Sequence, residues 1–336
     1  MLYWTDMKRI FSGITPSSSK GLHLGNFLGA VKPQVDLQAH GECMYFVANL
    51  HALNNVFNPE EIYKNTMNIF IEYLAFGVDP EKTTFFVESD IPGIPFLQTI
   101  LNNMVTVSEL KRMHGYKDKL QDDTNPDQIG MGLFSYPVLM AADILLFKPD
   151  IIPVGEDQSQ HVEIACEIAR TFNNRYGDIL KIPELSVQKN VARVPGIYGD
   201  RKMSKSLGND IPIFGTEQEI KKQIMSIKTD PARVHPTDPG NPDKNLAFTY
   251  FDLLSYEASK LEEMKEKYRK GKIGDVEIKS TFLNFFLEYF ADFRTKKIEL
   301  LKDKERIHEI RIQGAQKANA ITKPILDQIR RAIGLI

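Results

Sequence analysis

The sequence predicts an α/β protein in which a doubly wound parallel sheet is followed by an α-helical domain. Over the first two thirds of the 336 residues, strand-like apolar runs alternate with stretches of helical spacing. This alternation is typical of a parallel sheet with helices on both faces. Beyond about residue 210, helical spacing continues and strand-like runs become rare. We therefore expect a Rossmann-like domain at residues 1–209 and a helical domain at residues 210–336, whose last helix can pack back on the first domain.

The elements of the first domain are expected in regular order. Runs rich in β-branched and aromatic residues predict strands, and apolar residues three or four apart predict helices. The predicted strands span residues 9–14, 43–48, 83–88 and 151–155. The predicted helices span about residues 25–38, 59–76, 95–102 and 158–172.

The second domain is expected to consist of helices and turns. Helical spacing covers residues 217–227, 246–269, 275–301 and 304–334. The Pro-, Gly- and Asp-rich cluster at residues 235–242 predicts a surface loop.

Composition excludes several classes of protein. Charged residues make up 26 % of the chain and hydrophobic residues 42 %, as is usual for globular proteins. No apolar run reaches the roughly 18 residues that cross a bilayer, and the N-terminus lacks the pattern of a secretory signal. Two cysteines, Cys43 and Cys166, cannot form a disulfide framework or complete a zinc or iron–sulfur site by themselves. We expect a cytoplasmic protein that does not bind membranes or a structural metal.

The charge distribution is uneven. The net charge of −2 argues against general adhesion to nucleic acid. Residues 241–336, however, contain 19 lysines and arginines against 15 aspartates and glutamates, a balance of +4, which leaves −6 for the remainder. A basic bias in the last third is compatible with contact to RNA there.

A first motif, HLGN at residues 23–26, lies between the first predicted strand and its helix. Doubly wound sheets bind phosphate at such strand-to-helix turns. The His23 ring could donate a hydrogen bond to a developing oxyanion, and Gly25 would let a nucleotide approach the backbone. The other interpretation is a simple helix cap.

A second motif, KMSKS at residues 202–206, places two lysines three residues apart. A short loop of this kind can lay Lys202 and Lys205 along a polyphosphate. Without other evidence, two lysines at this spacing more often belong to a solvated surface loop. The interpretation as a phosphate site therefore depends on the presence of the HLGN motif upstream.

A carboxylate stands in an otherwise apolar helical segment, YPVLMAADILL, at residues 136–146. Burying Asp143 without a partner would cost several kcal/mol. Either a neighbouring Arg, Lys or backbone donor satisfies it, or a ligand does. An indole N–H is a donor that suits a carboxylate, and Tyr136 and Met140 would provide flat, polarizable walls for its ring.

Two further segments could contact a nucleotide. Gly155-Glu156-Asp157-Gln158 follows the strand predicted at residues 151–155, where acidic side chains can accept from ribose hydroxyls; Asp157 could equally be a helix cap. Lys119 is a possible phosphate ligand or an ordinary surface charge.

HLGN combined with KMSKS is similar to the two signatures of class I aminoacyl-tRNA synthetases. Together with the other segments, the chain resembles bacterial tryptophanyl-tRNA synthetases from Lys8 to its end. The phrases FSGITPS, HLGNFLGAV, YPVLMAADILL, PVGEDQSQH, KMSKS and GAQKANAI follow one another in that family's order. The resemblance implies ATP-dependent ligation of L-tryptophan to tRNA(Trp) through tryptophanyl-adenylate, with release of AMP and pyrophosphate. It also implies a homodimer whose residues 1–209 bind ATP and tryptophan and whose residues 210–336 bind the tRNA anticodon.

The resemblance assigns roles at the matching positions. Catalytic contacts to the phosphates are implied for Lys119, Lys202 and Lys205. ATP, accompanied by Mg²⁺ held mainly by phosphate oxygens and water, would be bound by Thr15, Pro16, Ser17, His23, Gly25, Asn26, Gly155, Glu156, Asp157, Val194, Lys202, Met203, Ser204, Lys205 and Ser206. Tryptophan would be bound by Phe11, His51, Tyr136, Met140, Asp143, Ile144, Val154 and Gln158, with Asp143 receiving the indole N–H.

The chain departs from the family pattern near the first motif. Thr15 stands where the family has Gln, and the stretch before HLGN is extended through residues 17–20. Three other functions share parts of the pattern: tyrosine specificity on the same scaffold, a nucleotidylyltransferase with a similar loop, and a paralogue that binds tryptophan or tRNA without ligating them.

Overall fold

The computed structural model describes residues 8–18, 20–121, 125, 129–154, 159–187, 194–199 and 201–336, with only the backbone described at 118–121, 154 and 185–187. The chain forms two compact units, each assembled from separated segments. The sheet unit comprises Met1–Ser19, Gln34–Asn190 and Lys302–Ile336, and the helical unit comprises Lys20–Pro33 and Val191–Leu301. The expected division by function at residue 210 is a different kind of boundary and stays a prediction.

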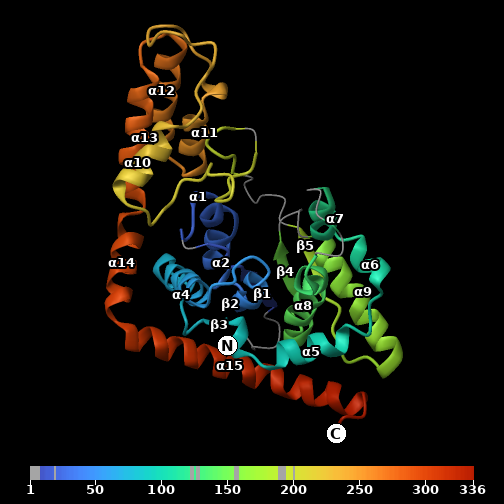
Figure 1. Cartoon of the computed structure of the whole chain (residues 1–336). Helices are drawn as coiled ribbons and strands as arrows, with labels where there is room; N and C mark the ends of the chain where they lie inside the picture. Colours follow the sequence, from blue (N-terminus) through green and yellow to red (C-terminus); the bar gives the residue numbers. More distant parts are fainter. Residues whose placement is uncertain are drawn as a thin grey trace. The chain divides into compact units, whose positions relative to one another are not determined.

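The sheet unit contains five parallel strands in the order β3-β2-β1-β4-β5 (Figure 1). They are β1 (Arg9–Ile14), β2 (Glu42–Val47), β3 (Thr83–Val87), β4 (Ile151–Val154) and β5 (Glu184–Val187). The pairing register puts Ile10 opposite both Cys43 and Ile151. The strand order reverses at β1, and ligands of doubly wound sheets bind beyond the carboxyl ends of the strands at such a switch point.

Helices and short turns surround this sheet. They are α2 (Lys32–Leu37), α3 (Asn49–Ala52), α4 (Pro59–Phe76), η3 (Glu88–Asp90), α5 (Gly93–Leu101), α6 (Val107–Lys111), α7 (His114–Gln121), α8 (Met131–Phe147), α9 (Ser159–Tyr176) and α15 (Lys304–Ala332). Local sequence explains their ends. For α4, Asn58 accepts from Glu60 N at 2.9 Å, Pro59 fits the first turn, and Gly77 adopts the left-handed conformation that ends the helix.

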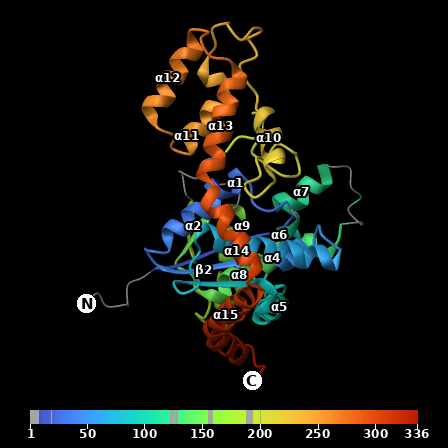
Figure 2. The same cartoon turned by 90° about the vertical axis from the view of Figure 1, so that its left-hand side faces the viewer.

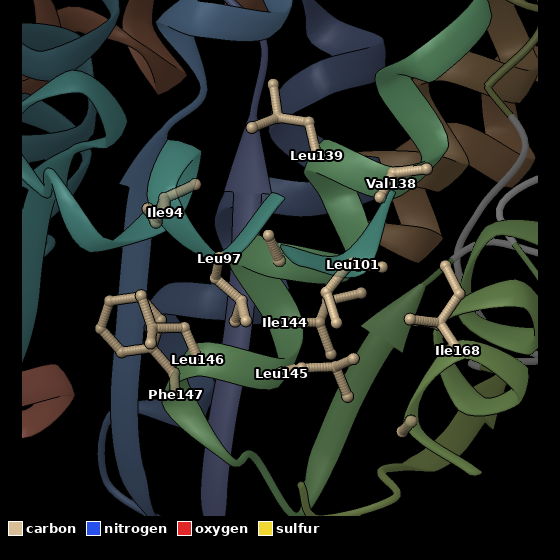
Figure 3. Packing of buried hydrophobic residues seen from close by; sticks show 14 of the residues in the cluster. Ile94, Leu97, Leu101, Val138, Leu139, Ile144, Leu145, Leu146, Phe147 and Ile168 are labelled. Atoms are coloured by element: carbon tan, nitrogen blue, oxygen red, sulfur yellow. The ribbon is translucent and has the colours of Figure 1, made fainter. Parts of the chain in front are cut away.

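The core of the sheet unit lies among β1–β4, α5, α8 and α9. Figure 3 shows its aliphatic side chains, including Ile94 and Leu97 of α5 and Leu145 of α8. On the sheet, the Phe11 ring stacks between Phe46 and Phe147 at centroid distances of 4.9 and 5.0 Å. Each fully buried side chain of this size contributes roughly 1.5–3 kcal/mol by leaving water, so the β1–α8 contact is strongly fixed.

The last helix, α15, packs directly against β3. A Cβ atom at Gly314 would lie 1.8 Å from the Phe85 carbonyl oxygen, so this position requires glycine. The Arg311 guanidinium also binds both carboxylate oxygens of Asp90 at 2.7 Å. The C-terminal helix is therefore part of the sheet unit.

The helical unit begins with a continuous helical run at residues 24–37, which continues into the sheet unit. Its elements are α1 (Leu24–Asn26), the π-helical η2 (Phe27–Val31), η6 (Pro242–Lys244), α10 (Glu217–Met225), α11 (Leu246–Leu253), α12 (Ala258–Arg269), α13 (Asp275–Tyr289) and α14 (Ala291–Lys302). Helices α11, α12 and α13 form one group, with α10 against α13 (Figure 2). Among the described residues, no helix combines the length and apolarity needed to cross a membrane.

Two sequence-based expectations need correction, and one strand was not predicted. The single helix predicted at residues 246–269 is two helices, since Ser255 has a φ of 55° and interrupts the run. The helix predicted at 275–301 is divided between α13 and α14 around Phe290. Strand β5 was not predicted, because only four residues form it and they lack a long apolar run.

Candidate functional site

The helical unit brings the HLGN and KMSKS motifs into contact across 178 residues of sequence. The backbone N–H of Gly25 lies 3.3 Å from the Met203 sulfur. A Cβ atom at Gly25 would meet the Met203 Cβ at 3.2 Å and the His23 ring at 3.0 Å, so a larger residue would push the two motifs apart. The Leu24 N–H also donates to the Ile211 carbonyl at 3.0 Å.

His23 caps the helical run and presents a defined tautomer. Its Nδ1 accepts from the Asn26 N–H at 3.3 Å, and the Asn26 amide oxygen accepts from the His23 N–H at 3.2 Å. Burial, followed by the charges of Lys205 and Lys202, lowers the pKa of His23 to about 3. A neutral ring that accepts at Nδ1 carries its proton on Nε2, where it can be donated. The helix-cap interpretation of this motif is thus correct, and it leaves one ring donor for another partner.

The KMSKS loop is held by backbone hydrogen bonds and by the side chains of Asn209 and its own serines. Met203 N–H donates to the Val194 carbonyl at 3.0 Å, and both side chains are buried. Ser204 N–H donates to the Asn209 side chain at 2.7 Å, while Ser204 and Ser206 hydroxyls lie 2.9 Å apart. Sequence reasoning did not single out Asn209, although an Asn directly after Gly208, whose φ is +62°, is a signal for a fixed turn.

The two motif lysines remain accessible. Lys202 is exposed and Lys205 half-buried, and both act on the His23 ring electrostatically. Two ammonium groups beside a ring N–H donor make a site that favours an anion with several oxygens. This part of the molecule can therefore stabilise phosphate charge.

In the sheet unit, the segment for which ATP contacts are predicted directly follows β1, the strand at which the strand order reverses. Thr15 and Ser17 are exposed and Pro16 is buried, with the Ser17 N–H bound to the Thr15 carbonyl at 2.9 Å. Other predicted positions are not covered: Gly155, Glu156, Asp157 and Gln158 lie outside the described residues, and the side chains of Lys119 and Val154 are not described.

A buried polar cluster lies at the carboxyl end of the sheet. The His51 Nε2 of α3 is 2.9 Å from the Asp143 Oδ2 of α8 and 3.6 Å from the Glu88 Oε1 that follows β3. Side-chain exposure is 13 % for His51, 1 % for Asp143 and 0 % for Glu88. The sequence left open whether a neighbouring protein group or a ligand satisfies the buried Asp143 carboxylate. The structure shows that one neighbouring protein group is present, the His51 ring.

The electrostatics of this cluster are dominated by burial. Burial lowers the pKa of His51, raises the pKa of Glu88 to about 8, and raises the pKa of Asp143 well above its ordinary value. His51 is thus neutral at pH 7, and in the tautomer that carries the proton on Nε2 it donates to Asp143. Sequence reasoning missed Glu88, because it directly follows a strand in a turn without any recognisable motif.

Aromatic and apolar groups adjoin this cluster. The Tyr136 hydroxyl lies 2.7 Å from His161 Nε2, and the Tyr136 ring meets the His51 ring edge-on at a centroid distance of 6.5 Å. Met140 is half-buried against the same core to which Phe11 and Ile144 belong. The structure therefore places Phe11, His51, Tyr136, Met140, Asp143 and Ile144 on α8 or next to this cluster and its core; their role in binding tryptophan stays a prediction.

The polar cluster contains residue types that can bind a metal ion. Among the described residues, His51, Glu88 and Asp143 are the one group of such side chains whose ligand atoms all lie within 4.8 Å of one another. Because the His51–Asp143 distance of 2.9 Å is that of a hydrogen bond, we assign the group to hydrogen bonding. The HLGN and KMSKS segments supply amides, a ring N–H and ammonium groups, which suit phosphate rather than a cation.

Comparison with known proteins identifies the family. The family model described as tRNA synthetases class I (W and Y) matches residues 5–291. The chain belongs to the class I tRNA synthetases. Within them it is 40 % identical over 331 residues to the tryptophan--tRNA ligase of Fusobacterium nucleatum, covering 98 % of this chain and 99 % of that protein. It is 39 % identical over 334 residues to the tryptophan--tRNA ligase of Deinococcus radiodurans, with coverage of 98 % and 99 %.

Solved synthetase structures agree with the fold. The tryptophanyl-tRNA synthetase of Campylobacter jejuni, complexed with ADP and tryptophan, superposes with a TM-score of 0.89 at 39 % identity and covers 97 % of this chain and 99 % of its own. The synthetase of Mycoplasma pneumoniae gives a TM-score of 0.81 at 26 % identity, covering 98 % of each chain. The predicted family and the predicted fold class, a Rossmann-like sheet with a helical C-terminal region, are both confirmed.

Proposed function

We propose that this chain ligates L-tryptophan to tRNA(Trp) at the expense of ATP, through a tryptophanyl-adenylate. The observation that carries the proposal is Asp143, a buried acceptor on a helix whose neighbouring residues Tyr136 and Met140 offer an aromatic and a thioether surface. The contact between HLGN and KMSKS supports nucleotide activation. Relatives with the name tryptophan--tRNA ligase match nearly the whole chain.

The amino-acid site is proposed to surround α8. Asp143 accepts the indole N–H while its other contacts hold the carboxylate in place. Tyr136 and Gln158 are suited to the polar end of the amino acid, and the remaining positions form apolar walls. The full proposed set is Phe11, His51, Tyr136, Met140, Asp143, Ile144, Val154 and Gln158.

The nucleotide site is proposed to use both motifs. His23 donates its Nε2 proton to a phosphate oxygen, Gly25 allows close approach, and Lys202 and Lys205 stabilise phosphate charge together with Lys119. Mg²⁺ supplies further charge neutralisation on the phosphates when bound, with few direct protein ligands. The other proposed contacts are Thr15, Pro16, Ser17, Asn26, Gly155, Glu156, Asp157, Val194, Met203, Ser204 and Ser206.

The reaction proceeds in two steps. A carboxylate oxygen of tryptophan attacks the α-phosphorus of ATP, the bond from that phosphorus to the β-phosphate bridge breaks, and pyrophosphate leaves. The terminal ribose 2′-hydroxyl of the tRNA then attacks the tryptophanyl carbonyl, and AMP leaves. The protein mainly positions the reactants and stabilises charge, since no covalent enzyme intermediate is needed.

The proposed partners beyond ATP and tryptophan are tRNA(Trp) and a second copy of the chain. In this arrangement a cytoplasmic homodimer binds a tRNA whose acceptor end meets one subunit and whose anticodon meets residues 210–336 of the other. The basic balance of +4 in residues 241–336 supports RNA contact there.

Pyrophosphate exchange with each proteinogenic amino acid tests the proposal. We expect tryptophan alone to support rapid exchange of label into ATP. Exchange with tyrosine instead would reassign the substrate within the same family. Binding of tryptophan without any exchange would identify a paralogue that does not ligate.

A further inference from the structure

Two carboxyl groups from different elements meet within the proposed amino-acid site. Glu88 begins η3 immediately after β3, and Asp143 lies on α8. Both are almost inaccessible, with residue exposures of 0 % and 1 %. One oxygen of each carboxyl group and a ring nitrogen of His51 all lie within 4.8 Å of one another.

In each of the two carboxyl groups, one oxygen has a hydrogen-bond partner and the other has none. Glu88 Oε2 accepts from the Leu50 N–H at 2.8 Å, and Asp143 Oδ2 accepts from His51 Nε2 at 2.9 Å. Glu88 Oε1 and Asp143 Oδ1 are buried and have no protein N–H or hydroxyl donor. Two adjacent buried carboxylates without donors would repel each other and lose their hydration. A single proton between these two oxygens satisfies both.

Among the residues that the structure describes, no group next to the pair supplies a compensating positive charge. The charges acting on Glu88 are those of Asp143 on α8 and His51 on α3, and burial keeps His51 neutral at pH 7. From α15, Arg311 binds Asp90 through both carboxylate oxygens and is thereby committed to that residue. The pair must therefore reduce its own charge.

The turn that carries Glu88 is also fixed in position. Its neighbour Asp90 is held by Arg311, and the Asp90 carbonyl accepts from the Asn319 side chain at 3.1 Å. Ser89 N–H donates to the Asn49 side chain at 3.0 Å. Because both sides of the turn are bound, the Glu88 carboxyl cannot easily move away from Asp143.

We propose that Glu88 is a specificity-determining positioning residue, which keeps its proton and donates it to Asp143 Oδ1. The pair then bears one negative charge, located on Asp143, whose remaining lone pairs face a ring N–H donor. This inference rests on the proposed function and deepens it: the protonated Glu88 orients the acceptor that distinguishes an indole from rings without N–H. Burial raises the pKa of both carboxyl groups, that of Glu88 to about 8, in agreement with a proton retained within the pair at pH 7. The His51 ring nitrogen is nearer to Asp143 (2.9 Å) than to Glu88 (3.6 Å), which favours the remaining charge on Asp143.

The test compares Glu88→Gln with Glu88→Ala in tryptophan-dependent pyrophosphate exchange between about pH 6.5 and 9.5. The amide mimics the protonated acid, so the KM for tryptophan should rise much less in Glu88→Gln than in Glu88→Ala, for which we expect about tenfold or more at pH 7. In the wild type, the KM for tryptophan should increase as the pH is raised above 8, approaching about tenfold per pH unit, because Glu88 loses its proton. In Glu88→Gln this increase should be absent. The KM for ATP should stay constant throughout. Glu81→Gln, on an exposed residue before β3, is the matched control.

Identical pH profiles in wild type and Glu88→Gln would overturn the inference, as would equal effects of the Gln and Ala replacements. A second measurement separates it from the proposed function. If Glu88 keeps its proton on folding, unfolding stability of the wild type must fall, relative to Glu88→Gln, as pH rises from about 4.5 to 8. That difference is measured by denaturant unfolding and does not require activity. Absence of tryptophan exchange would thus reject the proposed function, while a missing stability difference would reject the shared proton.

Discussion

The two candidate functional regions of this synthetase differ in charge and in burial. The HLGN–KMSKS contact in the helical unit relies on backbone hydrogen bonds and leaves lysines partly accessible around a neutral histidine. The His51–Glu88–Asp143 cluster in the sheet unit is closed and acidic. Burial acts in both, but it lowers the pKa of His23 and raises that of Glu88, since it disfavours whichever form is charged. One region is therefore suited to polyphosphate and the other to a neutral aromatic ring.

Lys205→Ala should produce the largest separation between the two regions. Removing one positioned cation from the transition state should slow adenylate formation by about 10²-fold or more, with little change in the KM for tryptophan. Pyrophosphate exchange under saturating and limiting tryptophan measures both quantities. Lys221→Ala on the exposed face of α10 is the control, and an equal loss in both variants would remove Lys205 from the mechanism.

Asp143→Asn should act on the other region with a somewhat smaller effect. The amide keeps the shape but loses charge assistance worth about 1–3 kcal/mol, so kcat/KM for tryptophan should fall by about 5- to 150-fold. A tryptophan analogue whose ring nitrogen is replaced by sulfur should lose much less, because it makes no such hydrogen bond. Equal losses for both substrates would show that Asp143 acts only through its bond to His51.

The difference between the HLGN–KMSKS contact and the His51–Glu88–Asp143 cluster also explains which residues could be predicted from the sequence. HLGN and KMSKS are short linear motifs, so their residues are recognisable before folding, although the Gly25–Met203 contact is not. Strands β1 to β4 could be predicted because each is a compact apolar run, whereas β5 lacks such a run. Ser255 interrupts an expected helix through its positive φ. Glu88 was missed since its importance comes from His51 and Asp143, which approach it only in three dimensions. The remaining positions, such as Asp157, stay predictions.

The neutrality of His23 gives a test with a smaller effect. Burial, Lys205 and Lys202 lower its pKa to about 3, so the folded state binds fewer protons than the unfolded state between that pH and about 6.5. Its contribution to stability is present above pH 6.5 and is lost as pH falls toward 3. In an NMR titration of ¹⁵N-labelled histidines, the resonance absent from His23→Gln should not shift near pH 6.5. A titration midpoint near pH 6.5 for this resonance would show that the His23 ring can become charged beside the two lysines, which contradicts the prediction.

The smallest effect is expected from the basic surface of α14, which tests whether RNA recognition is separate from activation. Lys297 lies 4.6 Å over the Phe214 ring and is half-buried, whereas the adjacent Lys296 is exposed. Lys296 is thus the better probe of RNA contact, and Lys297 the better probe of packing.

If tRNA phosphates approach this helix, Lys296→Glu should lower the rate of tRNA charging by a few-fold at low salt. It should also weaken the salt dependence of charging, because one fewer counterion is released on binding. Adenylate formation should be unchanged in this variant and should vary less with salt than tRNA charging, because ATP has far fewer phosphates than tRNA. Lys82→Glu, an exposed lysine in the sheet unit, serves as the charge-matched control. Equal salt dependence of activation and tRNA charging in the wild type would contradict the separation, and equal behaviour of the two variants would place the RNA on another face of the molecule.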